Sequence, residues 1–93
     1  MLIVNQMTRA EFIEKNKNLF WYIKKDKIQD IGNEVLVEFI FNYGTWEDVK
    51  ELIKIIGFQE LKVVYEATTD RKIGNYMPEM FNLLERIVFK YAS

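Results

Sequence analysis

The sequence predicts an all-α domain: a compact bundle of four to six short helices that cross at steep angles. Helix-capping residues recur along the chain, and apolar residues repeat at spacings of three and four. The most apolar stretch, 34–43, does not alternate between apolar and polar residues as a half-buried strand would. Turns of two or three residues favour steep crossings over a long up-and-down bundle. We expect residues 1–93 to form one domain, with residues 1–7 as a strand-like arm.

The first helix is expected to begin at Thr8, which has capping-box spacing to Glu11, and to run to about residue 17. The run 18–23 packs five apolar residues together, too densely for an amphipathic stripe. We interpret it as an irregular or short helical anchor in the core. Residues 24–28 add one further turn.

The next helix is expected at residues 34–43, with Asn33 as its N-cap and Gly44 as a left-handed C-cap. Its polar residues form one narrow stripe at spacings of four: Glu34, Glu38 and Asn42. A helix that is apolar around most of its circumference lies centrally in a fold or contributes to an interface.

Within that helix, Val37 and Phe41 lie four residues apart on one side. The remaining apolar residues suffice to fill the core side. We therefore predict an exposed partner-binding patch made of Val37 and Phe41 and flanked by Glu38. Burial of this side by other helices and the N-terminal arm is the alternative.

Thr45 is the expected N-cap of a helix over residues 46–56, and Gly57 is expected to end it. A further helix is predicted over residues 59–68. Its inward residues are expected to be Leu61, Val64, Tyr65 and Thr68.

Residues 69–75 are the most polar, turn-like stretch and are expected to form an exposed loop. Pro78, the only proline, suits the first position of a last helix over residues 78–90. One face of that helix is traced by Phe81, Leu84, Ile87, Val88 and Tyr91.

The chain contains no His and no Cys, and its only Ser is Ser93. The usual general base, thiolate nucleophile and imidazole metal ligand are therefore missing. We expect no catalysis, no metal centre and no cofactor. The absence of Cys fits a reducing compartment, and neither a secretory signal nor a membrane-length apolar run is recognisable, so we expect a cytoplasmic protein.

Two carboxylate pairs have the spacing of four that could hold a metal or serve as acid and base: Glu34 with Glu38, and Glu47 with Glu51. No His completes a metal shell, so we interpret both pairs as solvent-facing. Trp21 and Trp46 are candidates for binding hot spots, because Trp is enriched there. We expect both instead to be core anchors, as large aromatic side chains dominate small cores.

The net charge of −1 is unevenly distributed: +3 over residues 1–27, −6 over 28–70 and +2 over 71–93. An acidic centre argues against binding nucleic acid without sequence preference, which needs a consistently basic stripe. The alternative function is nevertheless a nucleic-acid-binding regulator, since the helices around Gly57 have helix-turn-helix lengths. Its candidate contact residues are Lys24, Lys25, Lys27, Lys62, Arg71 and Lys72.

The sequence resembles a family of short bacterial proteins in two segments: a Leu-Phe-Trp box at residues 19–21 and the stretch Tyr-Gly-Thr-Trp-Glu-Asp-Val-Lys-Glu-Leu-Ile at 43–53. The resemblance covers about residues 18–90. In residues 75–78, Asn-Tyr-Met-Pro replaces the family's usual pattern. Members are domains of unknown function, often encoded beside nucleotidyltransferase-type toxins of abortive-infection systems. The resemblance implies a small non-catalytic partner, with an antitoxin role as the most concrete form.

We therefore expect a non-catalytic module that binds a protein partner, a toxin or a second copy of itself. The expected mechanism is steric and electrostatic: a preformed helical surface covers the active or substrate-binding site of the partner.

Overall fold

The computed structural model describes residues 7–21, 23–71 and 76–92, without the side chains of 69–71. No strand occurs among these residues, and the all-α prediction is confirmed. In the described part of the chain, two 3₁₀ helices and four α-helices follow one another in the order α1 (Arg9–Lys15), η1 (Lys17–Phe20), η2 (Lys25–Asp30), α2 (Asn33–Tyr43), α3 (Trp46–Arg71) and α4 (Pro78–Tyr91). The predicted N-terminal arm falls outside the described residues except for Met7, which packs against the core.

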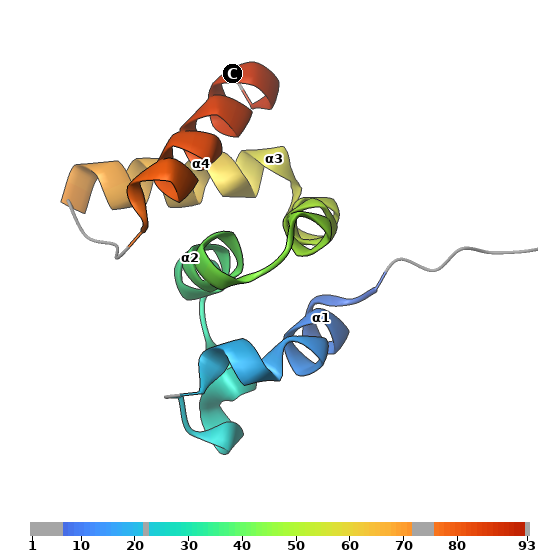
Figure 1. Cartoon of the computed structure of the whole chain (residues 1–93). Helices are drawn as coiled ribbons and strands as arrows, with labels where there is room; N and C mark the ends of the chain where they lie inside the picture. Colours follow the sequence, from blue (N-terminus) through green and yellow to red (C-terminus); the bar gives the residue numbers. More distant parts are fainter. Residues whose placement is uncertain (1–6, 22, 72–75, 93) are drawn as a thin grey trace, which may run out of the picture.

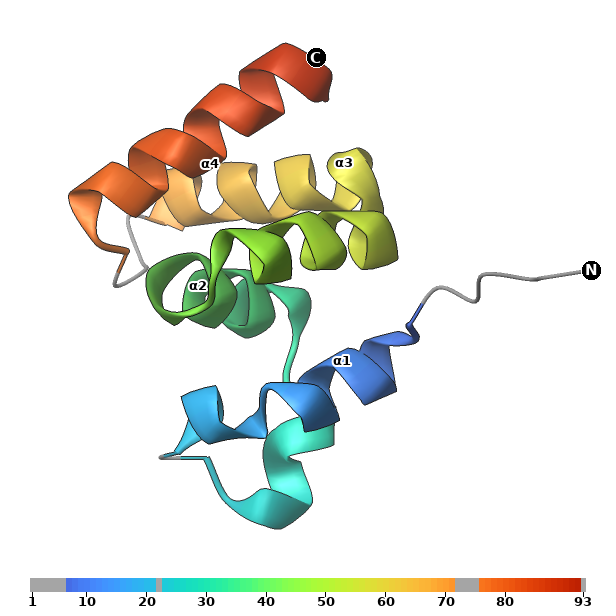
Figure 2. The same ribbon diagram turned by 45° about the vertical axis from the view of Figure 1, so that its right-hand side comes forward.

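The helices cross one another in two groups. Figure 1 shows α1, η1 and η2 in the lower part of the molecule, and α2, α3 and α4 in the upper part. Figure 2, turned by 45°, shows α4 lying across the second half of α3, with the C-terminus at the outer edge. Helix α2 contacts α3 and α4 in its own group and η1 in the other, so it lies centrally, between the two groups.

Local capping starts α1 as the sequence predicts. The Thr8 hydroxyl accepts from the Glu11 amide at 3.1 Å, and the Glu11 carboxylate accepts from the Thr8 amide at 2.8 Å. The helix ends at Lys15, slightly before the predicted residue 17, because the Asn16 side-chain amide donates to the Phe12 carbonyl at 3.0 Å. The first residues of the predicted anchor segment form part of η1. The predicted further turn forms part of η2.

The ends of α2 differ from the prediction. Gly32 is the N-cap and Asn33 is the first helical residue, because the Asn33 side chain is engaged in contacts with other helices. Gly44 is extended (φ −82°, ψ 174°) and not left-handed. A Cβ atom at Gly44 would lie only 2.8 Å from the Ile40 carbonyl oxygen and 3.1 Å from the Asp48 Cβ. Close approach of the chain, and not a positive φ, is therefore what favours glycine there.

Helix α3 bends at Gly57, which has φ 84° and ψ 161°. The predicted break between two helices is confirmed at this residue. The second half continues to Arg71, so the prediction of a loop from residue 69 is wrong for 69–71, and 72–75 lie outside the described residues. Because the loop starts later, the helix that faces α4 is longer than expected.

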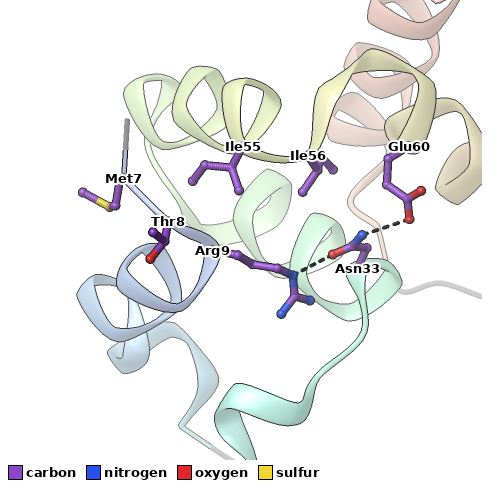
Figure 3. Close-up of a pocket in the computed structure, with 7 residues that line it drawn as sticks. All are labelled: Met7, Thr8, Arg9, Asn33, Ile55, Ile56 and Glu60. Carbon is purple, nitrogen blue, oxygen red and sulfur yellow. Dashed lines mark hydrogen bonds between the residues drawn. The ribbon is translucent and has the colours of Figure 1, made fainter. Parts of the chain in front are cut away.

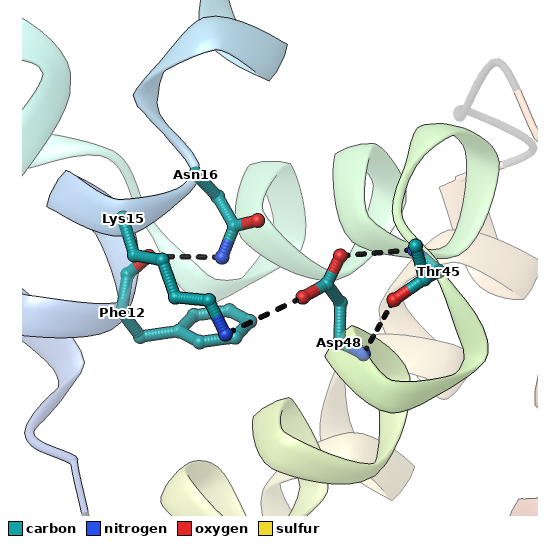
Figure 4. Close-up of polar contacts among 5 residues, drawn as sticks. All are labelled: Phe12, Lys15, Asn16, Thr45 and Asp48. Carbon is teal, nitrogen blue, oxygen red and sulfur yellow. Dashed lines mark hydrogen bonds and ion pairs between the residues drawn. The ribbon is translucent and has the colours of Figure 1, made fainter.

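Figure 4 shows how α1 meets the start of α3. Asp48 takes part in the cap of α3 with Thr45, and its other carboxylate oxygen lies 3.9 Å from Lys15 Nζ. Phe12, one turn before Lys15, is fully buried. An apolar side chain and a peripheral ion pair thus join α1 to α3.

The buried core contains sixteen residues, and none of the buried residues that the structure describes is polar or charged. Val37 and Phe41 belong to it, with exposed fractions of 0% and 1%. The predicted exposed patch at these two residues is therefore wrong. The alternative, burial by other helices, is what the central position of α2 produces.

Candidate interaction surfaces

An open groove between α1 and α3 holds a chain of polar contacts (Figure 3). Arg9 Nε donates to Asn33 Oδ1 at 2.9 Å, and Asn33 Nδ2 donates to Glu60 Oε2 at 2.9 Å. Arg9 Nη2 also donates to the Ile31 carbonyl at 2.7 Å. Asn33 thereby links the charges of α1 and α3 through the first turn of α2. We interpret this groove as a structural contact between helices, since the polar groups of Arg9, Asn33 and Glu60 are hydrogen-bonded to one another.

One titratable group is strongly perturbed. Burial raises the pKa of the Tyr76 hydroxyl above its ordinary value, and the carboxylates of Glu38 and Glu34 add to the rise. Thr68 opposes this pKa shift, yet its own hydroxyl donates to the Val64 carbonyl at 2.9 Å. The Tyr76 hydroxyl is left without a well-formed hydrogen bond among the described residues. The raised pKa keeps this hydroxyl neutral near two carboxylates.

The carboxylate pairs are placed only partly as predicted. Glu34 and Glu47 are exposed, and Glu47 Oε2 lies 3.0 Å from Lys50 Nζ. Glu38 and Glu51 are half-buried, so neither pair lies wholly in solvent. No group of three or more acidic side chains that could hold a metal ion occurs among the described residues.

The described lysines of the nucleic-acid alternative do not gather on one surface. Lys24, Lys25 and Lys27 are exposed in and beside η2, at the lower end of the molecule in both views. Lys62 is half-buried in the second half of α3, and that part of the helix belongs to the upper group of helices in both views. The side chain of Arg71 and all of Lys72 lie outside the described part of the chain.

The two tryptophans are surface residues. Trp21 is 80% exposed and Trp46 is 53% exposed, so the prediction that both are core anchors is wrong. Each stands at the end of a helix, Trp21 directly after η1 and Trp46 as the first residue of α3. The neighbouring core positions are filled by Phe20 and Val49, which are buried.

A row of aromatic rings runs along the junction of α3 and α4. Centroid distances are 5.1 Å for Phe58–Tyr91, 5.8 Å for Tyr65–Phe89, 5.6 Å for Tyr65–Phe81 and 5.6 Å for Tyr76–Phe81. We name this set the aromatic seam; its members are Phe58, Tyr65, Tyr76, Phe81, Phe89 and Tyr91.

Three members of the aromatic seam are exposed, Phe58 (37%), Phe89 (62%) and Tyr91 (55%), and the other three are half-buried. Sequence reasoning missed Phe58 and Phe89. It also grouped Tyr91 on one helix face with Leu84, Ile87 and Val88, which are buried, whereas Tyr91 is exposed. The spacing of seven residues between Phe58 and Tyr65 puts them on one helix face and was the available signal.

Comparisons with protein families, with curated proteins and with solved structures found no match for this chain. Within the described residues, no helix is both long enough and apolar enough to cross a membrane.

Proposed function

We propose that this protein is a non-catalytic module that binds another protein. The aromatic seam is the observation that carries the proposal, because it presents Phe58, Phe89 and Tyr91 to solvent on two packed helices. Large aromatic side chains supply much of the binding energy at protein interfaces, and their exposure on a small domain marks a contact surface. An inventory of side chains without His or Cys supports the non-catalytic part of the proposal.

The most specific form of this proposal is an antitoxin-like role in the cytoplasm of a bacterium. It is supported by the resemblance at residues 19–21 and 43–53 and by a composition without Cys. In this role a preformed helical surface covers the active or substrate-binding site of a toxin. No catalytic residue is needed for such steric inhibition.

Capture of partners with the tagged full-length chain tests this function. The bait is exposed to lysate of the source organism, bound proteins are identified by mass spectrometry, and the complex is rebuilt from purified components. We expect one protein in stoichiometric amount whose binding persists after nuclease treatment. If that protein is a toxin, equimolar addition of the module should inhibit it.

Two results would contradict the proposal. One is recovery of nucleic acid in place of a protein, with binding that weakens steeply as salt rises, as phosphate contacts require. The other is turnover of a substrate by the purified protein that a point mutation abolishes.

A further inference from the structure

The aromatic seam has a defined geometry on α3. Phe58, Lys62 and Tyr65 follow one another at spacings of four and three, which places them on one face of the second half of the helix. Rings of α4 contact this face at both ends, Tyr91 at Phe58, and Phe81 and Phe89 at Tyr65. The surface is thus a line along two packed helices, with one cation between its aromatic ends.

The size of the apolar surface favours a single segment over a whole second domain. If each ring offers about 200 Å², the exposed fractions of Phe58, Phe89 and Tyr91 leave about 300 Å² of aromatic surface. A stable dimer of standard size buries roughly 800 Å² on each partner. One helix that contacts the seam through a narrow stripe fits the smaller area, and a self-dimer centred there would need additional apolar surface.

Cations border the seam. Lys62 lies between its aromatic ends on α3, Arg86 precedes Phe89 by one helical turn, and Lys90 Nζ lies 5.4 Å from the centroid of Tyr91. No carboxylate in the described part of the chain lies within ion-pair distance of any of these three.

Two carboxylates belong to the same helices as the seam, and the carboxylates of Glu34 and Glu38 act on Tyr76 at one end of it. Glu85 accepts a hydrogen bond from the Tyr65 hydroxyl at 2.7 Å, and Glu66 is exposed on α3. Glu34 and Glu38 lie at the Tyr76 end of the seam, whereas Arg86 and Lys90 lie on α4 beside the exposed rings of Phe89 and Tyr91. The border of these exposed rings therefore favours acidic side chains on the partner.

We propose that the aromatic seam is the docking site for an amphipathic helix of the partner protein, one whose apolar stripe is flanked by Asp and Glu. This inference rests on the proposed function and names its contact surface. Apolar residues at positions i, i+4 and i+7 of the partner helix lie against Phe58, Phe89 and Tyr91. Its carboxylates lie beside Lys62, Arg86 and Lys90.

A designed peptide tests the docking site directly. The probe is a fluorescent helix of about 20 residues, long enough to be helical in water, with Leu at i, i+4 and i+7 and Glu beside this stripe. A matched peptide carries Lys in place of each Glu. We expect the full-length protein to bind the Glu peptide with a Kd below about 100 μM, and the Lys peptide at least about tenfold more weakly because its charges oppose the border.

Variants of the protein locate the binding. Phe89→Ala should raise the Kd of the Glu peptide by about tenfold or more, as for a hot-spot ring. Trp46→Ala is the matched control, since Trp46 is similarly exposed but lies outside the seam, and it should leave the Kd unchanged. Circular dichroism should show that both variants retain the helical spectrum and a thermal transition, because neither side chain is buried.

Several results would overturn the proposal. These are no binding of the Glu peptide, equal binding of both peptides, or equal Kd values for wild type and Phe89→Ala. If sedimentation shows a dimer that Phe89→Ala dissociates, the seam binds a second copy of this chain. If the protein binds an oligothymidylate and Phe89→Ala abolishes this binding, the seam binds single-stranded nucleic acid. A captured partner protein that tolerates Phe89→Ala but not Trp46→Ala would keep the proposed function and reject this surface.

Discussion

Thr45 and Asp48 cap the start of α3 reciprocally. The Asp48 amide donates to the Thr45 hydroxyl at 3.1 Å, and the Thr45 amide donates to the Asp48 carboxylate at 2.9 Å. Two amides that the helix itself leaves unpaired are satisfied in this way, and the carboxylate lies at the positive end of the helix dipole.

Thr45→Ala removes one half of this cap. We expect the free energy of unfolding to fall by about 1 kcal/mol, measured by urea denaturation. Glu47→Ala serves as control, because Glu47 is exposed and its carboxylate pairs with Lys50 on the surface. This substitution should change stability by less than about 0.5 kcal/mol. An unchanged urea midpoint for Thr45→Ala would show that the cap contributes nothing.

Gly57→Ala tests the bend in α3. Gly57 has φ 84° and ψ 161°, a conformation that side chains with a Cβ rarely adopt, although no atom lies within 4 Å of where that Cβ would be. We expect a loss of about 1–3 kcal/mol from backbone strain alone. Gly32→Ala is the matched control: the space there is equally open, but φ is −78°, so only a small change is expected. Equal effects of the two substitutions would contradict the assignment of strain to Gly57.

Phe41→Glu distinguishes core from surface. Phe41 is 1% exposed in α2, so a charged replacement should cost at least the ~3–5 kcal/mol expected for removing a buried Phe and should leave the protein largely unfolded. Tyr43→Glu, two residues later at a 55% exposed position, should remain folded. Circular dichroism with thermal melting measures both, and a well-folded Phe41→Glu protein would contradict the burial of α2.

Tyr76→Phe should make the protein more stable at alkaline pH than the wild type. Burial raises the pKa of Tyr76 in the folded state above the ordinary value of 10.0, so the unfolded chain loses this proton first as pH rises. The wild type therefore keeps its full free energy of unfolding below about pH 10. Above that pH this free energy falls, by at most about 1.4 kcal/mol per pH unit. Urea denaturation at pH values between about 8 and 11, the range around that ordinary pKa, should show a flatter decline of stability with pH for the variant.

At neutral pH the same variant removes a buried hydroxyl that lacks a hydrogen bond among the described residues. We therefore expect Tyr76→Phe to be neutral or stabilising near pH 7, because no partner is left unpaired. A clear loss of stability at neutral pH would mean that the hydroxyl has a favourable contact in the folded protein.

Local signals predicted where several helices begin. Thr8 and Thr45 cap helices, Pro78 opens α4, and Gly57 interrupts α3, all as expected. Such features depend on residues within about one turn, so they can be recognised from spacing alone. Asn33 fails as a cap for the opposite reason: its side chain is engaged by Arg9 and Glu60, which lie far away in the sequence.

Burial could not be predicted with the same success. The apolar circumference of α2 was compatible with an exposed patch at Val37 and Phe41 or with burial, and contacts of α2 with α3, α4 and η1 decide for burial. For Trp21 and Trp46 the prediction was burial, because their side chains are large and apolar. Both lie at helix ends and are exposed to solvent.

The sequence by itself determined the all-α class, the positions of the local caps and breaks, and a set of side chains without His or Cys. These follow from short-range hydrogen bonding, backbone freedom and composition. Only the tertiary structure decided which apolar side chains are covered and brought Phe58 into contact with Tyr91. The physical reason is that burial depends on which helices pack together, and residues 33 positions apart in sequence become neighbours only when α4 folds back across α3.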